Sequence, residues 1–179
     1  MVNKAVFLDR DGVLNELVKH GDTMTAPWTM NEFVFTKHAL DAVTLLKKLG
    51  YLTLVVSNQP DVYDGKMEYD TLKKINTAVK NILDVDLVMC AMNRKSTYYK
   101  PRTMMLETLM SVYEIDLDYC YIIGDSWKDI VCGYSVGVRT IFIGDKYTCP
   151  KEYVSVKPDY IVNNVLEACS IIEENELND

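Results

Sequence analysis

The chain has 179 residues, of which 49% are hydrophobic and 25% charged. These values are typical of an ordinary globular protein, so we expect a single domain over residues 1–179. The formal net charge of -7 disfavours nucleic-acid binding through a general basic field. No apolar run approaches membrane-spanning length, and the N-terminus lacks signal-peptide architecture. The sequence therefore predicts a cytoplasmic protein with neither a nucleic-acid nor a membrane partner.

The cysteines favour the same compartment. Their number, five, is odd, no CxxC pair occurs, and Cys120 lies in a strongly apolar run. This usage predicts reduced thiols in a cytosol rather than a disulfide framework.

Short apolar runs alternate with amphipathic segments along the chain. The apolar runs predict strands at 5–8, 52–56, 86–92, 119–123, 140–143 and 160–162. Helical spacing of apolar residues predicts helices at 37–49 and 67–83, one from a Thr103 cap to about residue 113, a short helix after 123, and a last one capped by Asn163. We expect the acidic tail 173–179 to fray.

Strands that are apolar on both faces and alternate with helices predict an α/β fold. We expect a Rossmann-like parallel sheet sandwiched by helices. Ligands in such folds bind beyond the carboxyl ends of the strands. Only short segments interrupt the expected elements, so we expect no large cap domain.

Polar motifs directly follow four of the expected strands. They are Asp-Arg-Asp-Gly-Val-Leu-Asn at 9–15, Ser-Asn-Gln at 57–59, Lys-Pro at 100–101 and Gly-Asp-Ser-Trp-Lys-Asp at 124–129. An Asp-x-Asp sequence alone is common in solvated turns. All four motifs would meet at one edge of the sheet, and this convergence is the strong signal.

The residue types at this edge suit phosphoryl transfer. The carboxylate of Asp9 could attack phosphorus, and Asp11, on the same side of an extended segment, could protonate the leaving alcohol and later activate water. Gly12 allows a tight turn there. Carboxylates facing an anion need a hard cation, and oxygen ligands favour Mg²⁺. The ammonium of Lys100 and the hydroxyl of Ser57 would bind the phosphoryl oxygens.

These motifs resemble, in order, those of the haloacid-dehalogenase (HAD) superfamily phosphatases. The run 9–15 and the segments 31–35 and 56–59 are most similar to the histidinol-phosphatase and heptose-bisphosphate-phosphatase branch, subfamily IIIA. The resemblance implies a Mg²⁺-dependent hydrolase of carbohydrate metabolism that forms an aspartyl phosphate. Its substrate would be a small phosphorylated metabolite such as a sugar phosphate. The protein would act as a monomer or small homo-oligomer.

The resemblance also implies residue roles, with Asp9 as nucleophile and Asp11 as general acid and base. Mg²⁺ would be held by the Asp9 side chain, the Asp11 backbone carbonyl and Asp125. The residues implied to hold the phosphate are Ser57, Asn58 and Lys100. Arg10 is a further candidate for phosphate binding, and it could either line the pocket or face solvent. Asp129 would steady Lys100 or the metal shell, and Gly12 is a second supporting residue.

The sequence departs from this branch in its third motif. The branch commonly carries a zinc loop of three Cys and one His, whereas Cys90 stands alone here, so we expect no zinc. Tyr99 replaces the arginine before the lysine, and Lys95 is a weaker rival to Lys100. Whether Arg94, Lys95, Tyr98 or Tyr99 contacts the substrate is left open.

Two other functions compete with a metabolite phosphatase. Nucleic-acid 3′-phosphatases use related cores, but the acidic net charge argues against that activity. A non-catalytic phosphate-binding or regulatory module would be expected to have lost Asp9 or Asp11, and both are present.

Overall fold

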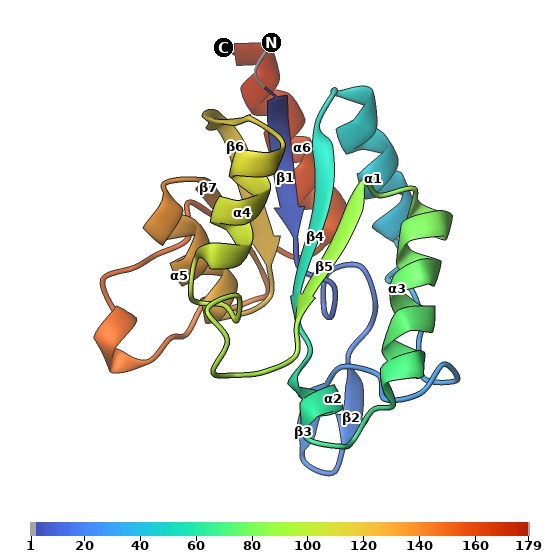
Figure 1. Cartoon of the computed structure of the whole chain (residues 1–179). Helices are drawn as coiled ribbons and strands as arrows, with labels where there is room; N and C mark the ends of the chain where they lie inside the picture. Colours follow the sequence, from blue (N-terminus) through green and yellow to red (C-terminus); the bar gives the residue numbers. More distant parts are fainter. Residues whose placement is uncertain (1–2, 179) are drawn as a thin grey trace.

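The computed structural model describes residues 3–178, and a six-stranded parallel sheet lies at its centre (Figure 1). In spatial order the strands are β5 (Leu87–Ala91), β4 (Leu52–Asn58), β1 (Asn3–Leu8), β6 (Ile115–Gly124), β7 (Arg139–Ile143) and β8 (Tyr160–Val162). The chain leaves β1 toward one edge of the sheet and later crosses to its other side at β6. The segments that follow β1, β4 and β6 therefore meet where the strand order reverses, which is where ligands bind in open α/β sheets.

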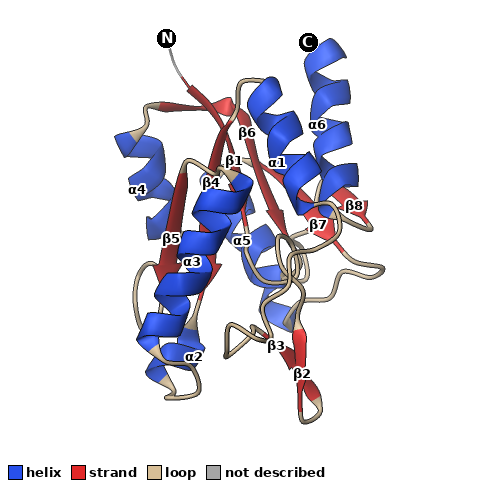
Figure 2. Ribbon diagram, turned by 90° about the vertical axis from the view of Figure 1, so that its right-hand side faces the viewer, coloured by secondary structure: helices blue, strands red, loops and turns tan. Residues whose placement is uncertain are grey.

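Helices cover both faces of the sheet (Figure 2). One layer contains α1 (Ala39–Lys48), α3 (Tyr69–Leu83) and α6 (Val165–Asn178), and the other contains α4 (Met104–Val112) and α5 (Trp127–Val136). Successive side chains of β1 enter opposite cores, since Val6 and Leu8 pack in the first and Ala5 and Phe7 in the second. This double burial explains why the strands are apolar throughout. The parallel α/β fold expected from the sequence is confirmed.

Smaller elements surround the carboxyl edge of the sheet, and the sequence did not predict them. An antiparallel hairpin of β2 (Val18–His20) and β3 (Thr23–Thr25) follows β1, and the short helix α2 (Pro60–Tyr63) follows β4. A 3-10 turn, η1 (Lys151–Tyr153), lies between β7 and β8. Over residues 3–178 only these short elements and the connecting loops are added at this edge, in agreement with the expected lack of a large cap domain. None of the helices in this range is both long and apolar enough to cross a membrane.

Three local predictions were wrong. The strand β6 begins at Ile115 rather than at 119. Thr103 precedes α4 but its side chain makes no cap hydrogen bond. The last helix is capped by Asn164 and not by Asn163, because the Asn164 Oδ1 accepts a hydrogen bond from the Glu167 backbone N–H at 3.0 Å.

The C-terminal tail is also more ordered than predicted. Helix α6 continues to Asn178, and Glu176 pairs with Lys4 of β1 at 2.5 Å and accepts a hydrogen bond from the Tyr51 hydroxyl. These contacts anchor the last turns to the sheet, so the expected fraying does not occur over 173–178. Residue 179 lies outside the described residues.

The packing of α1 gives a test of the fold. Leu46 is fully buried in the core between α1 and the sheet, so Leu46→Ala should lower the free energy of unfolding by about 2–5 kcal/mol. Leu40 on the same helix is 53% exposed, so Leu40→Ala should change it by less than about 0.5 kcal/mol. Urea denaturation of both variants checks the expectation. Equal losses would contradict the described orientation of α1.

Candidate active site

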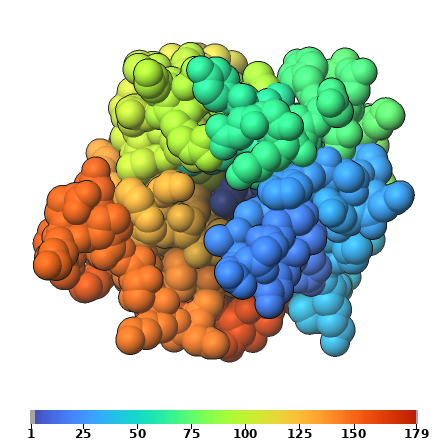
Figure 3. Space-filling view, turned by 90° about the horizontal axis from the view of Figure 1, so that it is seen from below, coloured from blue at the N-terminus to red at the C-terminus, as the bar shows by residue number. Residues whose placement is uncertain are grey.

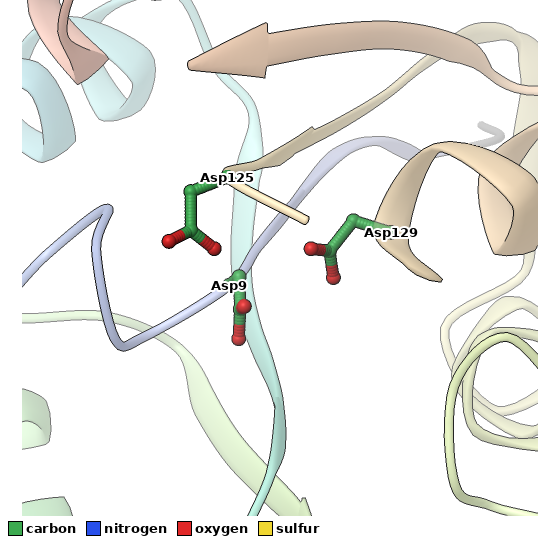
Figure 4. A group of neighbouring side chains, drawn as sticks. All are labelled: Asp9, Asp125 and Asp129. Atoms are coloured by element: carbon green, nitrogen blue, oxygen red, sulfur yellow. The ribbon is translucent and has the colours of Figure 1, made fainter. Parts of the chain in front are cut away.

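Three carboxylates converge at the carboxyl edge of the sheet. Asp9 follows the last residue of β1, Asp125 follows the last residue of β6, and Asp129 lies in the first turn of α5. One oxygen from each lies within 4.8 Å of the others, and the side chains face a common space (Figure 4). Among residues 3–178 this is the only group of at least three His, Cys, Asp or Glu side chains arranged to share an ion.

The ammonium of Lys100 lies within this group. Its Nζ is 3.2 Å from Asp9 Oδ1 and 2.5 Å from Asp129 Oδ1, and the side chain is only 1% exposed. Burial alone would lower the pKa of Lys100, but the carboxylates of Asp129 and Asp9 raise it above its usual value. Lys100 is therefore a fixed cation beside Asp9. Lys95, its rival in the sequence, is exposed and does not line the cleft.

Two neighbouring segments hold Lys100 and its partner in place. The Asn58 side chain donates to the Lys100 carbonyl at 2.9 Å and accepts from the Lys100 backbone N–H at 3.0 Å. Asp129 belongs to the capping box of α5, where its Oδ2 accepts from the Ser126 N–H at 3.2 Å. The amide of Asn58 thus fastens the third motif to β4, and Asp129 links helix α5 to the lysine.

Asp11 lies beside this group within a separate network. Its carboxylate accepts hydrogen bonds from Arg10 Nη2 at 2.9 Å, from Asn15 Nδ2 at 3.0 Å and from Gln59 Nε2 at 2.5 Å. Arg10 is fully buried and also donates to Asn76 of α3 at 2.8 Å. The structure therefore does not bring Arg10 to the cleft as a phosphate ligand, because the neighbouring carboxylate and Asn76 engage its guanidinium. Its contacts orient Asp11 instead.

Several residues of this network were not singled out by the sequence analysis. Gln59 is fully buried and donates to both Asp11 and the Ser57 hydroxyl, the latter at 2.8 Å. Ser57 is itself 1% exposed and does not line the cleft, so its predicted contact with phosphate is not seen in this arrangement. Gln59 lies inside the Ser-Asn-Gln motif, so the sequence contained a feature that could have identified it. No sequence feature identifies Asn76, because only the tertiary fold brings α3 beside Arg10.

Two glycines are required by close approach. Gly12 has a φ of +81°, and a Cβ there would lie 2.1 Å from Asp125 Oδ2. A Cβ at Gly124 would lie 2.3 Å from the Cβ of Asp129. Any larger residue would displace these carboxylates.

The carboxylates and Lys100 form the floor of a cleft of about 440 Å³. In Figure 3 a hollow opens between the blue hairpin region, the green α2 region and the orange α5 region, with dark blue atoms at its base. Of the residues left open above, Arg94 and Tyr99 line the cleft, whereas Lys95 and Tyr98 do not. The remaining walls come mainly from the hairpin, α2 and the start of α5.

The charge balance of the floor suits a divalent cation. Burial, together with the charge of Asp129, raises the pKa of Asp9 to about 7. Burial and the charges of Asp9 and Asp129 raise the pKa of Asp125 to about 8. Lys100 alone does not offset these carboxylates, and hard oxygen donors fit Mg²⁺. Asp9 and Asp125 are the better ligands, because both oxygens of Asp129 are engaged, Oδ1 by Lys100 and Oδ2 by the Ser126 N–H. In Asp9 the contacts from Lys100 and from the Arg10 N–H are both to Oδ1.

The single thiol near this network has a different environment. Cys90 accepts a hydrogen bond from Asn76 at 3.3 Å, and burial raises its pKa. The thiol therefore behaves as a half-buried, neutral side chain. That the protein binds no zinc stays a prediction.

Comparison with known proteins gives the class of the site. Residues 98–168 match the family described as HAD-hydrolase-like. The chain is 27% identical to D-glycero-beta-D-manno-heptose-1,7-bisphosphate 7-phosphatase of Salmonella typhi over 96% of each chain. It is 28% identical to the histidine biosynthesis bifunctional protein HisB of Campylobacter jejuni, covering 81% of this chain but 43% of that protein.

A solved structure shares the whole fold. D,D-heptose 1.7-bisphosphate phosphatase from B. bronchiseptica, complexed with magnesium and phosphate, superposes with a TM-score of 0.80 at 18% identity, covering 96% of this chain and 99% of that one. At this identity the likeness shows the fold alone. Over residues 98–168 the chain is similar to the HAD-like hydrolases. The relatives to which it is similar over most of its length are named as phosphatases.

The raised pKa values predict how stability depends on pH. Asp9 and Asp125 hold protons more tightly in the folded chain than in the unfolded one, where such carboxyls titrate at 3.8. Without metal the folded state therefore binds more protons between these values, and stability should fall as the pH rises from about 4 to about 8. Thermal unfolding of chelator-treated protein across this range checks the slope.

The same thermal unfolding experiment can be repeated with added Mg²⁺. Mg²⁺ binds the deprotonated carboxylates, so it should raise the melting temperature more at the alkaline end than at the acidic end. Asp125→Asn should flatten the slope and weaken the response to Mg²⁺. A metal-free protein that gains stability as the pH rises would refute the described burial of these groups.

Proposed function

We propose that this chain is a Mg²⁺-dependent phosphomonoesterase that acts through an aspartyl phosphate on Asp9. The observation that carries the proposal is the placement of Asp9 between Lys100 and Asp125 at the floor of an open cleft. The substrate is a small phosphorylated metabolite of the sugar-phosphate type. The relatives named as heptose bisphosphate phosphatases support this substrate class. We also infer that residues 1–179 act as one hydrolase domain.

In the first half of the reaction, the Asp9 carboxylate attacks the phosphorus atom. A bond forms between an Asp9 oxygen and phosphorus, the bond from phosphorus to the ester oxygen breaks, and Asp11 gives a proton to the leaving alcohol. The backbone N–H of Arg10 and the ammonium of Lys100 hold Asp9 Oδ1 at 2.8 and 3.2 Å, which fixes the orientation of the nucleophile. Holding a nucleophile in the geometry of attack can contribute a large part of an enzyme's rate enhancement.

In the second half, water attacks the phosphorus of the acyl phosphate. Asp11 takes the proton of this water, the bond between Asp9 and phosphorus breaks, and inorganic phosphate leaves. The contacts from Arg10, Asn15 and Gln59 keep the Asp11 carboxylate in one orientation for both steps. Lys100 stabilises the negative charge on the phosphoryl oxygens throughout.

The metal would be held by the side chains of Asp9 and Asp125 and by the backbone carbonyl of Asp11. Bound there, Mg²⁺ offsets the repulsion between carboxylates and phosphate and polarises the phosphoryl group. Asp129 keeps Lys100 in place, and Asn58 keeps the lysine loop against β4. These contacts leave the nucleophile preorganised before the substrate arrives.

Asp9→Asn tests the covalent mechanism. An amide is a poor nucleophile, so turnover of phenyl phosphate with Mg²⁺ should fall to a trace while the fold is retained. Near-UV circular dichroism checks the fold. In isotopically labelled water, the wild-type enzyme should place solvent oxygen in the released phosphate, because hydrolysis occurs at phosphorus. Substantial activity of the variant would exclude Asp9 as the nucleophile.

Lys100→Ala tests the assignment of the phosphate-binding cation. Loss of this ammonium should cost about 2–4 kcal/mol of transition-state stabilisation, as loss of one oxyanion donor does. Lys95→Ala removes an equal charge from the same loop and should change the Michaelis constant at most. Steady-state kinetics on both variants, each checked for folding, separates the two lysines. A dead Lys95→Ala enzyme beside a nearly normal Lys100→Ala enzyme would reverse the assignment.

A further inference from the structure

The cleft extends beyond its catalytic floor along a wall that no proposed catalytic role uses. This wall includes Asp61 of α2 and Lys66, and it faces the hairpin residues Thr23, Met24 and Thr25 across the same cleft. Because the phosphoryl group would occupy the floor, the rest of the substrate would lie against this wall. Its chemistry therefore decides which leaving groups fit.

Asp61 is an unusual residue to find in such a wall. Its side chain is 10% exposed, and its Oδ2 accepts a hydrogen bond from Trp28 Nε1 at 3.1 Å. Among residues 3–178 the partner of its Oδ1 is the ammonium of Lys66, at 3.6 Å, which is beyond normal hydrogen-bond length. An ionised carboxylate can accept about four hydrogen bonds. Asp61 is thus a largely buried carboxylate with unused acceptor capacity beside the cleft.

Neighbouring residues position both members of this pair. The backbone N–H of Lys66 donates to the Asp61 carbonyl at 2.8 Å, and the Lys66 ammonium lies 5.5 Å from the centre of the Trp28 ring. Trp28 stacks on His20 of the hairpin with ring centres 3.5 Å apart, and its backbone N–H donates to Glu32 at 2.8 Å. The carboxylate is therefore preorganised, as binding groups must be for specificity. The Lys66 side chain is 47% exposed, and its ammonium is kept near the carboxylate by the backbone contact and the Trp28 ring.

The charges next to Asp61 favour hydroxyl groups over a second anion at this position. The Asp61 carboxylate offsets the charge of Lys66, and Arg94, the next cation of the wall, donates to both carboxylate oxygens of Asp64 at 2.7 Å. An anion placed here would be repelled by the Asp61 carboxylate, and the charge of Lys66 is already offset by that carboxylate. A hydroxyl group both donates and accepts, so adjacent hydroxyls can donate to Asp61 and accept from Lys66 together.

We infer that Asp61 and Lys66 form a specificity site that binds hydroxyl groups of a polyhydroxylated leaving group. The inference rests on the proposed phosphatase activity and adds to it the residues that select the alcohol. Hydrogen bonds to charged groups contribute more than neutral ones, so the site distinguishes a polyol phosphate from an alkyl phosphate of the same length. An alkyl chain would leave the buried carboxylate without the donors that a polyol supplies.

The test compares two substrates of equal chain length, hexitol 6-phosphate and n-hexyl phosphate. The kcat/KM of each is measured by phosphate release for the wild type, Asp61→Asn and Lys66→Met. The wild type should prefer the hexitol ester, and each variant should lower this preference by about ten- to a hundredfold. The asparagine can still accept from Trp28 Nε1, so the wall should keep its structure, and near-UV circular dichroism checks this.

Glu68→Gln is the matched control. It also removes one carboxylate charge, a few residues further along the chain, but Glu68 is exposed and does not line the cleft, so the preference should stay within about twofold. The inference would be overturned if the wild type hydrolysed both esters with equal kcat/KM. It would also be overturned if Asp61→Asn lowered the kcat/KM of both esters by the same factor. Phenyl phosphate serves as a third substrate that has no hydroxyl groups. If the wild type fails to hydrolyse it and both hexyl esters, the proposed function itself fails and the inference with it.

Discussion

The ammonium of Lys100 is a single buried positive charge between the carboxylates of Asp9 and Asp129, and the floor of the cleft is arranged around it. Carboxylates removed from water are costly unless a cation or hydrogen-bond donors compensate them. The structure meets this requirement with three segments far apart in sequence. Asn58 fixes the lysine loop to β4, and Asp129 joins the lysine to the first turn of α5. The residual negative charge defines where a divalent cation would be bound.

Much of this arrangement could be predicted because a parallel sheet imposes it. Strands that are apolar on both faces are recognisable in sequence, and their carboxyl ends must lie at one edge. The convergence of Asp9, Lys100 and Asp125 follows from that rule without any knowledge of side-chain geometry. The predicted order of strands and helices was confirmed for the same reason. Boundaries were less accurate where local signals compete, as at the adjacent Asn163 and Asn164 before α6.

The parts that could not be predicted depend on the direction of individual side chains. Arg10 lies in the first motif and could have faced a phosphate, but burial against Asp11 and Asn76 turns it away. The hairpin after β1 is short and polar, so it lacks the hydrophobic alternation that marks a strand. Its position over the cleft is set by contacts such as that between His20 and Trp28, which only the folded chain reveals.

The ion pair between Lys4 and Glu176 brings the two ends of the described chain together, at the edge of the sheet opposite the cleft (Figure 1). Adjacent ends are the geometric condition for circular permutation. A chain joined there by a short linker and opened at another exposed turn would keep each motif at its strand end. The motifs would then occur in a different order along the polypeptide while remaining neighbours in space. Their linear order therefore reflects connectivity, whereas the chemistry requires only that they share one edge of the sheet.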